Sequence, residues 1–372
     1  MRQLAALAAA VVLVVGAVAV RRAIDDDGAT TSGSGEPILV CPVELADACE
    51  VVEGTMIVRP EPAATTGEAV SAGEPVAGDG PGDTDGTAAT GDPADTGDPA
   101  DTESPGGAGE RPRVWLTTRP WAEAVADQRD RSGLAPLPGE PTATIARSPV
   151  ALVVWDDRAD VLADGPCAGT IGWRCLGEAA GRPWSEVGGP ADWGVVRAGL
   201  GSPDTAGGPV VLGAAVAGFL GTGDYAANDF GDELIGWLTG WLPPAATAAG
   251  DEPVARMLTR GPGELSAVGA LEVDARRAAD REDVLVIYPA PVAVAELVAV
   301  PIGGDDGAAV GAAEAVAADE ALLDALADAG WRVEGRPPAS GIDEGTTVPG
   351  DDGLPGGAVL HALRTRWQEV TG

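Results

Sequence analysis

The segment from Ser202 to Gly208 could bind an anion, because a threonine and two glycines stand directly before an apolar run that predicts a helix. A turn of this kind leaves backbone N–H groups unpaired at the start of the helix, where the helix dipole adds positive potential. Thr205, Gly207 and Gly208 would supply the nearest donors, and Pro209 removes one. The alternative is that the segment only caps the helix.

Groups for acid–base or nucleophilic catalysis are few. The single histidine, His361, lies on a predicted amphipathic C-terminal helix, and the chain contains no GxSxG, HExxH or Walker motif. Residues 221–226 match GxGxxA, but they follow a predicted helix, whereas a dinucleotide loop follows a strand. Carboxylate pairs stay possible among 58 acidic residues. We therefore expect no enzyme and no cofactor.

Four cysteines form two pairs that are close in sequence, Cys41 with Cys49 and Cys167 with Cys175. An even number in an exported chain indicates two disulfides, and the spacing fits no zinc site. We predict pairing within each close pair, although no sequence rule decides against cross pairing. Residues 42–48 could not all be helical, because a helix would hold Cys41 and Cys49 too far apart.

The N-terminal segment is an apolar run without charge from residue 3 to 20 and ends at Arg21 and Arg22. Its length is close to that needed to cross a bilayer, so residues 1–22 predict a transmembrane anchor. The small residues 17–19 keep a cleaved signal peptide open as the alternative. Because the cysteine pairs indicate an oxidising compartment, we expect the rest of the chain outside the cell membrane.

The charge balance excludes one class of partner. The net charge is −35, and all 23 basic residues are arginine. Nucleic-acid binders need a clustered basic surface, so we expect no nucleic acid partner.

Two segments are too polar to bury a core. Residues 23–36 predict a flexible tether. Residues 61–111 are rich in proline, glycine and acidic residues and repeat TGDPAD, which predicts a disordered acidic insertion. Calcium binding by residues 83–86 is a weaker alternative, since the EF-hand ligand order is missing.

The remaining segments alternate between apolar strands and helices, which predicts an α/β fold with mostly parallel sheets. Strands are expected at 38–40, 55–58, 114–117, 144–155, 195–199, 284–288 and 296–302. Helices are expected at 43–50, 121–131, 176–180, 209–220, 232–242, 253–260, 322–329 and 359–370.

Three stretches resemble the type 2 periplasmic solute-binding proteins, in particular the sulfate- and molybdate-binding branch. TIARSPVALVVW (144–155) resembles the strand that crosses between the lobes, and VLVIYPAPVAVAELVAVPI (284–302) resembles the return strands. SPDTAGGPVVLGAAVAGFL (202–220) resembles the (N/D)PxTSGG turn that begins a helix. Ala206 stands where an oxyanion-binding relative carries serine, which puts oxyanion specificity in doubt.

The resemblance implies a two-lobed fold with two hinge-crossing strands. Residues 37–146 would begin lobe 1, residues 147–290 would form lobe 2, and residues 291–372 would complete lobe 1. Arg119, Trp121, Arg147 and Ser148 would lie at the cleft, where arginine could bind a carboxylate and tryptophan could stack on a ring or cation. The alternative is that Trp121 is a core residue and the arginines are solvated.

The function that the resemblance implies is extracytoplasmic binding of a small ligand between the lobes, for ABC-type uptake or for sensing, with a permease or surface complex as a possible partner. The alternative is a degenerate, ligand-free domain that acts as a surface interaction or structural module.

Overall fold

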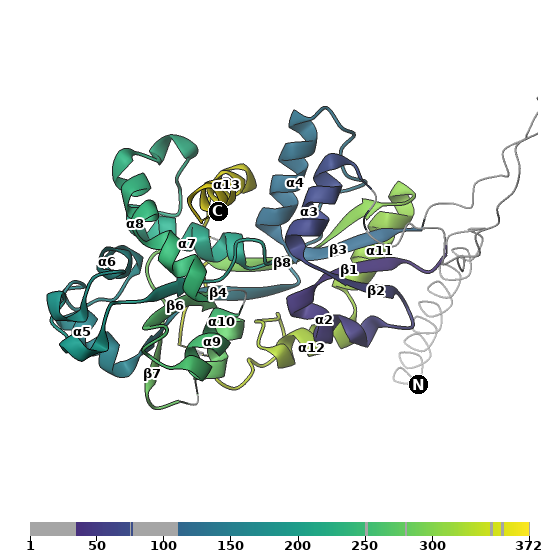
Figure 1. Cartoon of the computed structure of the whole chain (residues 1–372). Coiled ribbons are helices and arrows are strands. Elements are labelled where there is room, and N and C mark those ends of the chain that lie inside the picture. Colours follow the sequence, from purple (N-terminus) through teal and green to yellow (C-terminus); the bar gives the residue numbers. More distant parts are fainter. Residues whose placement is uncertain are drawn as a thin grey trace, which may run out of the picture.

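A computed structural model describes residues 35–74, 76, 111–249, 252–279, 281–342, 345–350 and 353–371. Two α/β halves lie on either side of the long strands β4 (Ala146–Trp155) and β8 (Val294–Gly303) (Figure 1). Nearly all residues of β4 and β8 are buried, on both faces of each strand, as expected for strands with protein on each side.

The two long strands connect the halves through their pairing. Ala146 to Pro149 pair antiparallel with β8, in the register Ala146 with Leu297, whereas Val150 to Val154 pair with β6 (Ala267–Leu271). The first part of β4 therefore belongs to the sheet of lobe 1 and the rest to the sheet of lobe 2. The strand order is β2-β1-β3-β8-β4-β6-β5, with β7 also paired to β4.

Lobe 1 contains β1 (Ile38–Pro42), β2 (Ile57–Glu61), β3 (Arg113–Thr118) and the far end of β8. Its helices are α2 (Ala46–Cys49), α3 (Ala63–Ala72), α4 (Arg119–Arg131), α11 (Asp306–Ala317) and α12 (Glu320–Ala329). Lobe 2 contains β5 (Ala198–Leu200), β6, β7 (Val284–Ile287) and the end of β4. Its helices are α5 (Asp156–Asp164), α6 (Trp173–Ala179), α7 (Gly208–Leu220), α8 (Asp232–Ala249), α9 (Pro253–Arg260) and α10 (Glu272–Ala275).

The expectation of mostly parallel sheets is wrong. The pairs β1–β2, β1–β3 and β5–β6 are parallel, but β3–β8, β4–β8, β4–β6 and β4–β7 are antiparallel. The reason is the crossing: the return strand β8 runs against both β3 and the outgoing strand β4. The described sheet is therefore mixed.

The acidic insertion begins later than predicted. Residues assigned to it form the end of β2 and the helix α3. Composition gave no sign of this helix, because it buries small residues: Ala63 and Val70 lie in one apolar cluster with Trp115 and Trp121. An added Cβ at Gly67 would lie only 3.0 Å from the Trp121 ring, so a small residue permits this approach. Residues 77–110 and the calcium alternative at 83–86 lie outside the described part of the chain.

The C-terminal helix α13 (Gly357–Thr371) bridges the two halves. It packs against α4 of lobe 1 and against α7 and α8 of lobe 2 (Figure 1). Leu360, Leu363 and Trp367 are buried, as their helical spacing predicted. The helix begins so close to α4 that an added Cβ on Gly357 would lie 2.5 Å from the Ala124 nitrogen, which leaves room for glycine only.

Both disulfides join the close pairs, so that prediction is confirmed. Cys41 bonds to Cys49 and Cys167 to Cys175, with Cα–Cα distances of 6.6 and 5.1 Å. The chain between Cys41 and Cys49 bends, since a 3₁₀ turn at Val43–Leu45 precedes the single α-helical turn of α2.

The predicted membrane anchor and tether lie outside the described residues. Within the part that the structure describes, no helix combines the length and apolarity needed to span a bilayer.

Candidate functional site

A cavity of about 360 Å³ lies between the two halves. Lobe 1 lines it with residues of the Cys41–Cys49 loop, with Ala329 at the end of α12 and with Trp331, two residues further along the chain. Lobe 2 lines it with the start of α7, the start of α9, β6 and the segment 273–277. The ionisable side chains in the lining are Glu44, Asp47, Glu252, Asp274, Arg276 and Arg277.

The turn before α7 forms one wall of the cavity. Thr205 Oγ1 donates to the Ser202 carbonyl at 2.9 Å, and the Gly208 N–H donates to the Thr205 carbonyl at 3.3 Å. An added Cβ at Gly208 would lie 2.0 Å from the Ser202 oxygen, so the turn requires glycine there. Thr205, Gly207 and Gly208, the predicted anion donors, all line the cavity.

The same turn is hydrogen-bonded to lobe 1. Thr118 Oγ1 donates to the Ala206 carbonyl at 2.7 Å, and Trp121 Nε1 donates to the Thr205 carbonyl at 3.1 Å. Ala206 is 5% exposed and belongs to the apolar cluster of lobe 1 that contains Trp115. An alanine in place of serine therefore has a structural reason, because its methyl group packs into lobe 1.

A carboxylate of the protein is bonded to the turn that precedes α7. The Ala206 N–H donates to Glu44 Oε1 at 3.2 Å, and Glu44 belongs to the loop after β1 in lobe 1. Ala206, which lies among the predicted donors Thr205, Gly207 and Gly208, thus already has an anionic partner.

The remaining charges are unevenly paired. Arg277 Nη1 contacts Glu252 Oε1 at 3.2 Å, while the side chains of Asp274 and Arg276 make no hydrogen bond or ion pair with any described residue. Burial raises the pKa of Asp274 to about 6; the charge of Arg277 opposes this rise, and those of Glu44 and Glu252 add to it. Ionisation of the Asp274 carboxyl in the cavity therefore costs free energy, which a nearby cation would offset.

The helix α10, which carries Asp274, is held in place by hydrogen bonds to residues that do not line the cavity. Arg332 donates to both oxygens of Glu272, with Nε–Oε2 and Nη2–Oε1 distances of 2.7 Å, and Tyr288 also donates to Glu272. The Glu272 side chain is 1% exposed. Ser148, which is fully buried, accepts a hydrogen bond from the Val273 N–H at 3.1 Å. Tyr288 and Ser148 thus position α10 and do not line the cavity.

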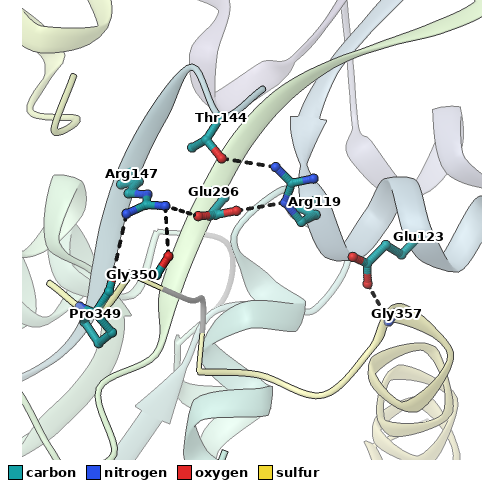
Figure 2. Close-up of polar contacts among 8 residues, drawn as sticks. All are labelled: Arg119, Glu123, Thr144, Arg147, Glu296, Pro349, Gly350 and Gly357. Carbon is teal, nitrogen blue, oxygen red and sulfur yellow. Dashed lines mark hydrogen bonds and ion pairs between the residues drawn. The ribbon is translucent and has the colours of Figure 1, made fainter. Parts of the chain in front are cut away.

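The two predicted arginines meet at the hinge and not in the cavity. Arg119 Nε contacts Glu296 Oε2 at 2.8 Å, and Arg147 Nη2 contacts Glu296 Oε1 at 2.6 Å, so the carboxylate on β8 lies between them (Figure 2). Arg147 also donates to the carbonyls of Pro349 and Gly350, on the segment that leads to α13. We define Arg119, Arg147 and Glu296 as the hinge triad.

The hinge triad holds its carboxylate ionised. Burial raises the pKa of Glu296, but hydrogen bonds from Arg119 and Thr144 and the charges of Arg119 and Arg147 outweigh it, so the pKa lies below its ordinary value. Trp121, the fourth predicted cleft residue, is 4% exposed and also lies outside the cavity lining.

In the described part of the chain, no group of three or more His, Cys, Asp or Glu could hold a metal ion. Among the described residues that line the cavity there is no histidine, cysteine or tyrosine.

Sequence reasoning missed the acidic and basic side chains of the cavity. Glu44 and Asp47 had one usable signal, since they lie inside the loop that the Cys41–Cys49 disulfide closes. Glu252, Asp274 and Arg276 had none, because nothing in their local sequence distinguishes them from other charged residues.

Comparison with known proteins adds a fold class. No family model and no curated protein matches this chain. Similar solved structures include an ABC transporter protein from Clostridium perfringens (TM-score 0.51, 11% identity, 90% of this chain and 100% of that chain). FutA2 from Synechocystis is similar in its apo form (TM-score 0.51, 11% identity, 91% and 98%), as is a periplasmic thiamin-binding protein (TM-score 0.52, 10% identity, 91% and 97%).

At these identities the likeness shows a shared fold. The chain therefore has the two-lobed α/β fold of the periplasmic binding proteins, as the resemblance implied, and the sulfate- and molybdate-binding branch stays a prediction.

Proposed function

We propose that this chain is an extracytoplasmic solute-binding protein that holds a small ligand in the cavity between its lobes. The observation that carries the proposal is the cavity itself. Residues of both lobes line it, and the start of α7 forms part of its wall. Ligand sites favour such concave regions between domains, and one of the similar structures is named as a thiamin-binding protein. Service to ABC-type uptake or to sensing, with a permease or surface partner, is part of the proposal.

A thermal-shift screen tests this function. The full-length chain is melted with oxyanions, amino acids, sugars, amines and metal ions. A ligand at one hundred times its Kd should stabilise the native state by about 2.7 kcal/mol by mass action, which is a shift of several degrees. A midpoint that no solute moves would contradict the proposal. A parallel esterase, phosphatase and glycosidase panel tests the expectation that the chain is not an enzyme.

We also propose that residues 1–22 hold the protein at the cell membrane with both lobes outside, and secretion after cleavage is the alternative. The two disulfides support an oxidising compartment. N-terminal sequencing of protein from membrane and medium fractions distinguishes the alternatives, and free thiols in cytosolic material would contradict both.

A second candidate function is a ligand-free interaction or structural module. It is favoured by the docking of the Ser202–Gly208 turn onto Thr118, Trp121 and Glu44, which fills with protein the place where a ligand was expected. The screen separates the two candidates, since a domain that is closed on itself should respond to no solute.

A further inference from the structure

Glu44 lies at the centre of the inference. Its carboxylate accepts from the Ala206 N–H at 3.2 Å, across the junction between lobe 1 and the first turn before α7. The disulfide from Cys41 to Cys49 closes the loop that carries it, so this carboxylate is tethered at high local concentration. It is the anion that the turn before α7 already binds through Ala206.

An inorganic oxyanion meets two obstacles in this cavity. It must displace the tethered carboxylate to reach the Ala206 amide, and it must then lie near Asp47, Glu252 and Asp274. Like charges brought together in a partly desolvated site repel strongly. Oxyanions are therefore the wrong charge class for this site.

A cationic group meets the opposite conditions. The lining carries four carboxylates against two guanidiniums, and one of these guanidiniums, on Arg277, already contacts Glu252. The Asp274 carboxylate has no hydrogen bond or ion pair in the described part of the chain. Leu45, Val254 and Trp331 add apolar wall beside these charges. A cation on a small organic body matches both the charge and the surface.

We propose that Glu44 sets the charge selectivity of the cavity: it excludes inorganic oxyanions and, with Asp274, receives the cationic group of a small organic ligand. This inference rests on the solute-binding role proposed above. Glu44 is thus a specificity-determining residue that acts by occupying one donor and by presenting its own charge.

Three variants of the full-length chain separate these two actions. Glu44→Ala removes both the carboxylate and the hydrogen-bond acceptor. Glu44→Gln keeps an oxygen that can accept from Ala206 and removes only the charge. Glu50→Ala removes a carboxylate that is close in sequence and does not line the cavity, and it is the matched control. Glu44 and Glu50 are exposed, so all three variants should fold, which circular dichroism checks.

The probes are putrescine, choline and L-arginine as cations, sulfate and molybdate as oxyanions, and glucose as a neutral solute. Affinity is measured by calorimetric titration. We expect wild type to bind at least one cation and no oxyanion. Both Glu44 variants should bind that cation about tenfold more weakly or worse. Glu44→Ala removes the first obstacle and leaves Asp47, Glu252 and Asp274 in place, so it should have the highest sulfate affinity of the set, above wild type and Glu44→Gln, and Glu50→Ala should match wild type.

The outcomes against the proposal are distinct. Sulfate or molybdate binding by wild type would overturn it, as would unchanged cation affinity in both Glu44 variants. Binding of glucose alone would overturn the charge class and leave the solute-binding role standing. If wild type binds no probe and responds to no solute in the wider screen, the solute-binding role fails. Whether Glu44 excludes oxyanions is then tested on its own: sulfate binding by Glu44→Ala supports this role of Glu44, and no sulfate binding contradicts it.

Discussion

The two lobes meet differently on the two sides of the crossing strands. On one side α13 closes the junction (Figure 1). Its Leu360, Leu363 and Trp367 are buried, and Arg364 contacts both Glu68 of α3 and Asp204 of the turn at 2.7 Å. On the other side, between α2 and the α9–α10 region, the lobes leave a cavity in which the side chains of Asp274 and Arg276 have no partner among the described residues. One side is thus built for stability, while the other keeps polar groups available at a cost in stability.

The largest effect is expected from a variant in α13, on the side where this helix closes the junction between the lobes. Trp367→Ala leaves a hole under α13 and should lower the free energy of unfolding by about 3 kcal/mol. Urea denaturation followed by circular dichroism measures it. The control is Gln368→Ala, one residue further along the same helix and exposed, which should change stability by less than about 0.5 kcal/mol. Equal effects of the two variants would show that α13 does not join the lobes.

A smaller effect is expected at the hinge triad. Glu296→Gln removes the charge between two arginines that are 28% and 34% exposed, so solvent offsets part of the loss and about 1–2 kcal/mol should remain near neutral pH. Because the pKa of Glu296 is lowered in the folded state, its contribution is present above the ordinary glutamate pKa and is lost as pH falls through the folded value. Urea titrations across acidic pH should show wild type and variant converging, and a constant difference would contradict this account.

The smallest effect is expected on the cavity side, where the variant Asp274→Asn should raise stability and not lower it. Burial raises the pKa of Asp274 to about 6, so the folded state keeps a proton that the unfolded chain loses, and stability falls as pH rises from about 4 through 6. Asp274→Asn should therefore raise the melting midpoint by about 3 °C at about pH 8 and by almost nothing at about pH 4. Asp47→Asn, which neutralises a more exposed carboxylate of the same lining, should raise it less. A destabilised Asp274→Asn would mean that Asp274 has a partner that stabilises its charge.

Periodicity predicted the framework of the fold well. Strands β4 and β8 were predicted because their sequences are long apolar runs, and their crossing between the lobes was implied by the resemblance to the solute-binding proteins. The helix α3 was assigned to the acidic insertion, because its alanines, threonines and glycine become a core surface only against Trp121. Strand β6 was missed because a short AVGAL segment has too little pattern, and its Gly269 is dictated by contact with Trp173.

The part of the candidate site that could be predicted from sequence is the turn before α7, whose binding groups are backbone N–H groups. The glycine-rich turn is a local signal, and Thr205, Gly207 and Gly208 do line the cavity. Arg119 and Arg147 had the right residue type for ligand binding, but sequence could not show that Glu296, about 150 residues or more along the chain, would take both. Glu44 and Asp274 could not be recognised among 58 acidic residues, because their roles arise from what folding places opposite them.

The pairing of β3 with β8 has a consequence for how the protein is made. Residues 113–118 are synthesised long before their antiparallel neighbours at 297–303, and the whole of lobe 2 must emerge in between. Throughout that interval one edge of β3 offers unsatisfied N–H and carbonyl groups, which are a template for pairing with foreign strands. A nascent chain stalled before residue 297 should therefore be a client of chaperones, while lobe 2, which is contiguous in sequence, can begin to collapse by itself.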